Sequence, residues 1–175
     1  MDKPFEDPVT ARIVGFVRGI GLSVVRAELD DTAFLPGLAL EAGHLVIDEG
    51  RLLYPGDILH EAGHLAVMPG DKRVQSNGRL GTDGGQEMGA IAWSYAAALH
   101  LGLDPAVLFH ADGYRDGAGA LLENFAEGRF VGVPYLQWLG LTLEPARAVQ
   151  QGVPPYPHML GWLNTQCAPD AARSD

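Results

Sequence analysis

The chain of 175 residues has the length of one globular domain, and 47% of its residues are hydrophobic, enough to bury a core without structural metal ions or disulfide bonds. Its formal net charge of −10 and pI of about 4.9 disfavour binding to phosphate backbones and anionic lipid. We therefore expect no nucleic acid and no membrane among its partners. The composition leaves the oligomeric state open.

The chain contains a single cysteine, Cys167. One thiol excludes a disulfide within the chain and a thiolate metal cluster. The first eight residues are acidic and interrupted by proline, unlike a signal peptide. No apolar run reaches the roughly 18 residues of a membrane-spanning helix. These features favour a cytoplasmic location.

The first third of the chain predicts one helix and several short strands. Apolar residues at helical spacing predict a helix from Val9 to Ile20. Short runs of apolar, partly β-branched residues then predict strands at Ser23–Leu29, Leu38–Leu40, His44–Ile47 and Arg51–Tyr54. Together they indicate a small, twisted and mostly antiparallel sheet.

The rest of the chain is predicted to be mainly helical. Asp57 is a suitable N-cap for a helix that ends near Val67, before Pro69 and Gly70. The glycine-rich segment 69–85 predicts a long loop, and a second alanine-rich helix follows from Gln86 to Leu101. Further short helices are predicted after Asp104, at Ala118–Glu127 and at Val133–Leu139, with an irregular tail from Gln150. We expect one α+β domain spanning residues 1–175.

The first long helix after the sheet contains an H-E-x-x-H motif, His60-Glu61-Ala62-Gly63-His64. Residues four apart on a helix differ by only about 40° in direction, so both imidazoles project from one face and can bind one Zn²⁺. Glu61 lies about 100° round from His60. That position lets it act as a general base towards a water molecule activated by the ion. The alternative is a helix with two satisfied histidines and a surface glutamate.

A catalytic zinc ion needs a third protein ligand and an open position. Glu87, near the start of the second long helix, is the best candidate, and the small residues that follow it allow a close approach to the first helix. Alternatively, Glu87 is an ordinary first-turn glutamate favoured by the helix dipole. Weaker candidates for the third ligand are Asp83, His100, Glu123 and His110.

Peptide hydrolysis also needs a donor for the developing oxyanion. Tyr114 is the candidate we select, with Tyr95 and His110 as alternatives. His44 lies on a predicted strand just before the motif. That strand could pair with an extended peptide, although a sheet-surface position is the more common role of such a residue.

The order of helix, short sheet, His60–His64 motif and Glu87 helix resembles the ImmA/IrrE-type zincin-like metallopeptidases over residues 9 to 102. The resemblance implies a zincin-like fold with the metal between the two central helices. It implies that His60, His64 and Glu87 bind the metal and that Glu61 is the base. No helix-turn-helix region is apparent, although some members have one, and the section after Leu103 lies outside the resemblance.

The sequence therefore predicts a zinc-dependent hydrolase, a metallopeptidase acting on a peptide or protein substrate. The alternative is a catalytically silent metal-binding or regulatory interaction module. Zn²⁺ suits two imidazoles and a carboxylate, and Fe²⁺, Mn²⁺, Co²⁺ or Ni²⁺ could occupy the same ligands.

Overall fold

The computed structural model describes residues 4–31, 33–78, 80, 83–110 and 117–166. In this part of the chain the fold is α+β, with three strands, seven α-helices and one 3-10 helix. The elements in chain order are α1 (Pro8–Gly19), β1 (Ser23–Arg26), β2 (Leu38–Glu41), β3 (His44–Ile47), α2 (Gly56–Val67), α3 (Gly70–Arg73), α4 (Gly84–His100), η1 (Pro105–Val107), α5 (Ala118–Ala126), α6 (Val133–Trp138) and α7 (Pro145–Gln151).

The sheet is mixed, whereas the sequence predicts a mostly antiparallel one. β2 and β3 form an antiparallel hairpin, but β1 pairs parallel with β3, giving the strand order β1-β3-β2. Ala42 and Gly43 both have positive φ, 46° and 77°, as a two-residue hairpin turn of the tight primed type requires. The hairpin follows from this local turn. The parallel pairing depends on the path of residues 27–37, which local periodicity does not reveal.

The predicted strand Arg51–Tyr54 is absent. The backbone N–H groups of Arg51 and Leu52 donate to the carbonyl of Asp48 at 3.1 and 2.9 Å, so the chain turns back instead of extending. Leu53 is 63% exposed, because no neighbouring strand covers this apolar segment.

The predicted loop 69–85 begins with the short helix α3 and then contacts the hairpin. Gly78 N–H donates to Leu40 C=O at 2.9 Å, and Gly43 N–H donates to Ser76 C=O at 2.8 Å. A further helix, α7, ends at Gln151, at the start of the tail that the sequence predicts to be irregular. In the described part of the chain, no helix is both long enough and apolar enough to cross a bilayer.

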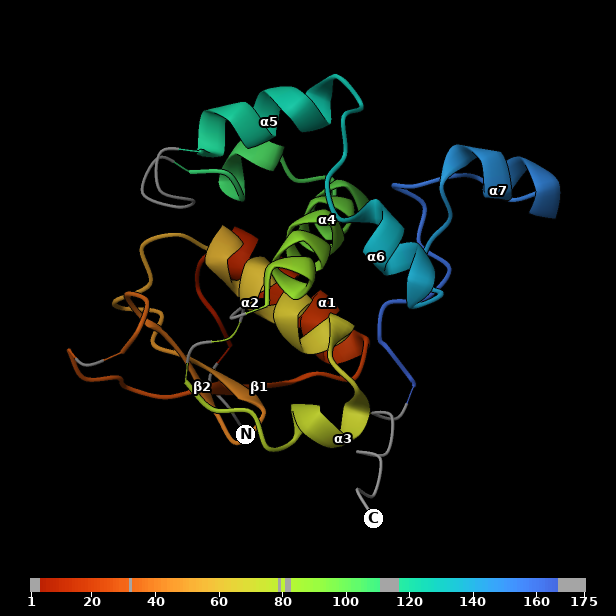
Figure 1. The fold of residues 1–175 in the computed structure, drawn as a ribbon. Helices are drawn as coiled ribbons and strands as arrows, with labels where there is room; N and C mark the ends of the chain where they lie inside the picture. Colours follow the sequence, from red (N-terminus) through yellow and green to blue (C-terminus); the bar gives the residue numbers. More distant parts are fainter. Residues whose placement is uncertain (1–3, 32, 79, 81–82, 111–116, 167–175) are drawn as a thin grey trace, which may run out of the picture.

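Helix α2 lies in the centre of the molecule, beside α4 and α1, with the sheet below it in the view of Figure 1. The apolar side chains of α2 are fully buried: Ile58, Leu59, Ala62, Leu65, Ala66 and Val67. An environment that is apolar on several sides leaves little room for a charged group without a partner. The buried polar side chains of α2 therefore require interaction partners.

Helices α2 and α4 approach closely at Gly63, inside the H-E-x-x-H motif. A Cβ atom at Gly63 would lie 2.8 Å from the backbone oxygen of Ala90. Only glycine permits this separation. Because Ala90 is three residues after Glu87, the same contact brings the first turn of α4 against the motif.

Candidate metal centre

Helix α2 places its two histidines and its glutamate together in a buried position. The exposed fractions of His64 and Glu61 are only 3% and 8%, and His60 is partly buried. Each of the three residues offers a ligand atom, and these atoms lie within 4.8 Å of one another. The predicted proximity of the two imidazoles to each other and to Glu61 is confirmed.

The two imidazoles face each other through their Nε2 atoms, which are 3.1 Å apart, and the ring planes are nearly perpendicular at 86°. Glu87 reaches both rings. Its Oε1 lies 3.5 Å from Nε2 of His60 and its Oε2 lies 3.1 Å from Nε2 of His64. We refer to these three residues as the His60–His64–Glu87 cluster.

These separations fit one tetrahedral zinc ion. With bonds of about 2.0–2.1 Å, neighbouring ligand atoms of a tetrahedral ion lie about 3.3 Å apart. The two Nε2 atoms lie 3.1 Å apart, and each lies 3.1–3.5 Å from a different oxygen of the Glu87 carboxylate, close to that value. Two nitrogens and one carboxylate leave a fourth position for water or substrate, which is the composition of a catalytic zinc site.

The electrostatics of the cluster keep His60 in the form that binds metals. Burial, followed by the neighbouring His64, lowers the pKa of His60 from 6.5 to about 4, and Glu87 acts in the opposite direction. The imidazole of His60 is therefore neutral at neutral pH, with a lone pair available to a cation. Nδ1 of His64 is buried and has no hydrogen-bond partner among the described residues. Helix packing, rather than a second polar group, orients this ring.

The start of α4 explains why Glu87 points at α2. Asp83 caps the helix, with its Oδ1 accepting hydrogen bonds from the backbone N–H groups of Gly85 and Gln86 at 2.8 and 3.1 Å. The helix therefore begins at Gly84, two residues before the predicted start. Glu87 lies in its first turn, where the helix dipole favours a carboxylate. Asp83, a candidate third ligand, has this capping role instead.

The other candidate ligands and donors lie elsewhere or outside the described residues. The ring of His100 packs against Phe16 and Trp162 on an exposed part of α4. Glu123 is exposed on α5. Tyr95 is buried against Phe125, with ring centroids 4.7 Å apart. Tyr114, our candidate oxyanion donor, and Cys167 lie outside the described residues.

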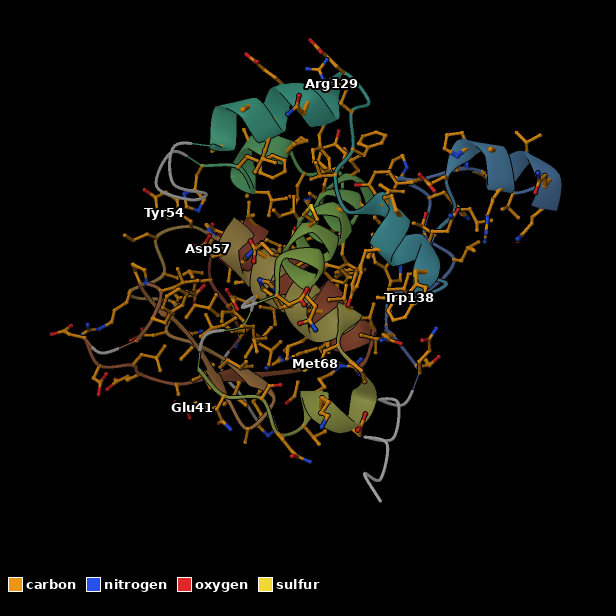
Figure 2. The ribbon with its side chains drawn as sticks, viewed as in Figure 1. Glu41, Tyr54, Asp57, Met68, Arg129 and Trp138 are labelled. Atoms are coloured by element: carbon orange, nitrogen blue, oxygen red, sulfur yellow. The ribbon has the colours of Figure 1, made fainter. Side chains whose placement is uncertain are left out.

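Asp57, on α2, and His110, which follows η1, form a separate pair. His110 Nε2 lies 2.8 Å from Asp57 Oδ1, and the ring of Tyr54 stacks on His110 at 3.7 Å. Figure 2 shows Tyr54 and Asp57 together at the N-terminal end of α2. The predicted N-cap role of Asp57 is wrong, because α2 begins one residue earlier, at Gly56 after Pro55. Burial raises the pKa of Asp57, and His110 opposes that shift.

A cavity of about 360 Å³ has Glu61 in its wall, whereas His60, His64 and Glu87 are not among its described lining residues. Edge strand β2 supplies another wall through Leu38–Glu41. His44 is exposed on β3, the sheet-surface position that is the more common role, and β3 cannot pair with a peptide because it is paired on both sides. The cavity escaped the sequence analysis because residues of the 28–41 segment meet Glu61 only in the folded chain.

The described residues form an α+β fold in which His60, Glu61 and His64 lie near one another. The chain matches no protein-family model, no curated protein and no solved structure.

Proposed function

We propose that the chain is a zinc-dependent hydrolase of the metallopeptidase class, with His60, His64 and Glu87 as the metal ligands. The observation that carries this proposal is the approach of two Nε2 atoms to each other and to the Glu87 carboxylate at 3.1–3.5 Å, with both imidazoles largely buried and Glu87 partly exposed. Three protein ligands with nitrogen and oxygen donors favour zinc, and other divalent ions of the first transition row fit the same donors.

Glu61 has the position of the general base. It follows His60 directly on α2, its side chain is buried, and it lines the cavity. When bound, the ion would acidify a water molecule and polarise the substrate carbonyl. The carboxylate of Glu61 accepts the proton of the attacking water and then delivers it to the leaving amine.

The cavity and strand β2 favour a peptide as the substrate class. β2 is an edge strand, so one of its sides lacks a partner strand. That side is partly occupied, because Gly78 N–H donates to Leu40 C=O and Leu38 N–H donates to Leu35 C=O, so a peptide would contact β2 between these two points. A substrate lying along β2 would have its backbone beside Glu61, where both line the same cavity.

The test is the substitution Glu61→Gln, which preserves the shape of the side chain but cannot accept the proton. We expect zinc content to be unchanged and hydrolysis of peptides to fall by about 10²–10⁴-fold. Both are measured on the same preparation, by elemental mass spectrometry and by a peptide cleavage assay. Glu123→Gln, on the exposed face of α5, is the matched control for the loss of one negative charge.

Turnover by Glu61→Gln equal to that of the wild type would rule out this mechanism. Zinc binding without turnover in the wild type, over broad peptide and ester libraries, would support the second function, a metal-binding regulatory module.

A further inference from the structure

Segment 156–164 forms hydrogen bonds with both helices that supply the proposed metal ligands. On the α4 side, the hydroxyl group of Tyr156 donates to the carbonyl of Ala92 at 2.9 Å, and the indole N–H of Trp93 donates to the carbonyl of Trp162 at 2.9 Å. Trp93 is fully buried and Tyr156 is 5% exposed. These bonds fix the segment against the middle of α4.

On the α2 side, Asn164 binds the last turn of the helix. Its backbone N–H donates to Ala66 C=O at 2.8 Å, and its side-chain amide donates to Val67 C=O at 3.0 Å. Asn164 is 3% exposed, so these bonds lie in a low-dielectric setting that strengthens them. The segment therefore connects the helix of the motif histidines to the helix of Glu87.

Arg73, at the end of α3, completes the capping of α2. Its Nε donates to Leu65 C=O at 2.7 Å, and its Nη2 donates to Met68 C=O and Asn164 C=O at 3.0 Å each. Met68 has an extended backbone with ψ 144°, so α2 ends without a left-handed capping residue. Arg73 and Asn164 together bind the carbonyls of residues 65–68, at the end where a helix leaves its own carbonyls unpaired and where a positive charge is favourable.

The direction of the His64 ring depends on this last turn. Nδ1 of His64 is buried and has no hydrogen-bond partner among the described residues, so no second polar group there holds the ring. In most metal sites a carboxylate or carbonyl accepts from the second ring nitrogen and fixes the ring. Here the backbone of α2 has that role, and the carbonyl of Leu65, which follows His64 directly, is bound by Arg73.

We propose that Arg73 and segment 156–164 are positioning elements of the metal site, because they hold α2 and α4 at the separation at which His64 and Glu87 meet. We refer to them together as the α2–α4 brace. The brace contains none of the proposed ligands, so it acts through the helices that carry them. The inference rests on the proposed function, because it takes His60, His64 and Glu87 as the metal ligands.

The experiment measures the binding of Co²⁺, used as a spectroscopic substitute for zinc. The visible absorption of bound Co²⁺ reports the geometry of its ligands, whereas a loss of fold stability alone leaves the spectrum of the bound form unchanged. Arg73→Met keeps an aliphatic stem and removes the capping donors, and Asn164→Ala removes the side-chain donor to Val67. Arg18→Met is the matched control, since Arg18 donates from Nε and Nη2 to the carbonyl of Val24 at 3.3 and 2.8 Å, on a strand without proposed ligands.

We expect the Kd for Co²⁺ to rise about tenfold or more in Arg73→Met, as is typical when a group that orients a ligand is lost. The spectrum at saturating Co²⁺ should change as well, because His64 shifts relative to Glu87. Asn164→Ala keeps its backbone bond and should show the same spectral change with a smaller rise in Kd. Arg18→Met should match the wild type in both. Circular dichroism identifies the folded variants, and the milder Asn164→Ala decides the test if Arg73→Met does not fold.

Wild-type affinity and spectrum in the folded brace variants would overturn the brace and leave the proposed function standing. A loss of affinity without a spectral change, or an equal loss in Arg18→Met, would also overturn it, since the brace would then contribute only to general stability. Absence of Co²⁺ binding by the wild type would contradict the proposed function and the brace together.

Discussion

The His60–His64–Glu87 cluster and the Asp57–His110 pair each join a residue of α2 to a residue of another segment through an imidazole–carboxylate contact, but their geometries differ. In the pair, one imidazole meets one carboxylate at 2.8 Å. In the cluster, two imidazole Nε2 atoms face each other at 3.1 Å, and one glutamate contacts both. One carboxylate can balance one imidazolium. Two facing lone pairs are better satisfied by a cation between them.

A histidine next to an acidic residue does not by itself indicate a metal site. A metal site is favoured when several electron-pair donors lie apart by about the edge length of a coordination tetrahedron. In the Asp57–His110 pair one carboxylate oxygen meets one ring nitrogen, and the ring of Tyr54 stacks on His110. Both groups contain a buried Nδ1 without a hydrogen-bond partner among the described residues, on His110 and on His64, so the difference lies in the second imidazole of the cluster and in the lowered pKa of His60.

The largest expected difference between the two groups is in zinc affinity. Glu87→Ala removes one of three ligands, and we expect the Kd for zinc to rise more than about 100-fold, equivalent to about 2.7 kcal/mol. His110→Ala removes the corresponding interaction of the pair and should leave the Kd unchanged. Competition titration with a chelator measures both. Similar losses of zinc affinity in the two variants would contradict a metal site formed by the cluster and not by the pair.

The next effect is a pH dependence of the metal-free protein. The pKa of His60 is about 4 in the folded protein against 6.5 for the free side chain. Between these values the unfolded chain holds a proton that the folded chain does not, so acidification favours unfolding. The stabilisation is complete above pH 6.5 and is lost as the pH falls towards 4. From pH 7 to pH 5 we expect a loss of about 2 kcal/mol from this group.

Urea unfolding of the metal-free wild type and of His60→Gln at pH 7 and pH 5 isolates the contribution of His60. The decrease in the free energy of unfolding should be smaller in the variant by about that amount. An identical decrease in both proteins would mean that burial of His60 does not perturb its titration.

A smaller effect is expected from the helix contact that supports the cluster. In Gly63→Ala the new Cβ would approach the Ala90 backbone oxygen to 2.8 Å, so α2 and α4 must separate. We expect a roughly tenfold weaker Kd for zinc, about 1.4 kcal/mol, because Glu87 moves with α4. Gly15→Ala is the control, since a Cβ there meets nothing within 4 Å. Unchanged affinity in Gly63→Ala would show that the cluster tolerates helix separation.

The sequence predicts the parts of this site that depend on local periodicity. Helical spacing places His60, Glu61 and His64 on neighbouring positions of one helix, and the structure confirms their proximity. Helices α1 and α4 and strands β2 and β3 also lie within a few residues of their predicted ranges. Each of these elements depends on spacing or turn chemistry within a short window.

The remaining features depend on contacts between distant segments. The partner of Asp57 is 53 residues away, so a capping role was the natural local interpretation. The parallel pairing of β1 with β3, the Gly63–Ala90 contact and the cavity beside Glu61 likewise form only when separate elements pack. Glu87 could be proposed as a ligand from its position on α4, but its distance to His64 follows from the packing of two helices.

We propose that one metal ion binds between α2 and α4. The metal content of the purified protein, measured by elemental mass spectrometry, tests this directly. Wild type, His64→Ala and Glu61→Gln are compared after loading with zinc and removal of free ions. We expect about one zinc ion per chain in the wild type and in Glu61→Gln, and none in His64→Ala. Absence of zinc from the wild type, or full retention in His64→Ala, would contradict it.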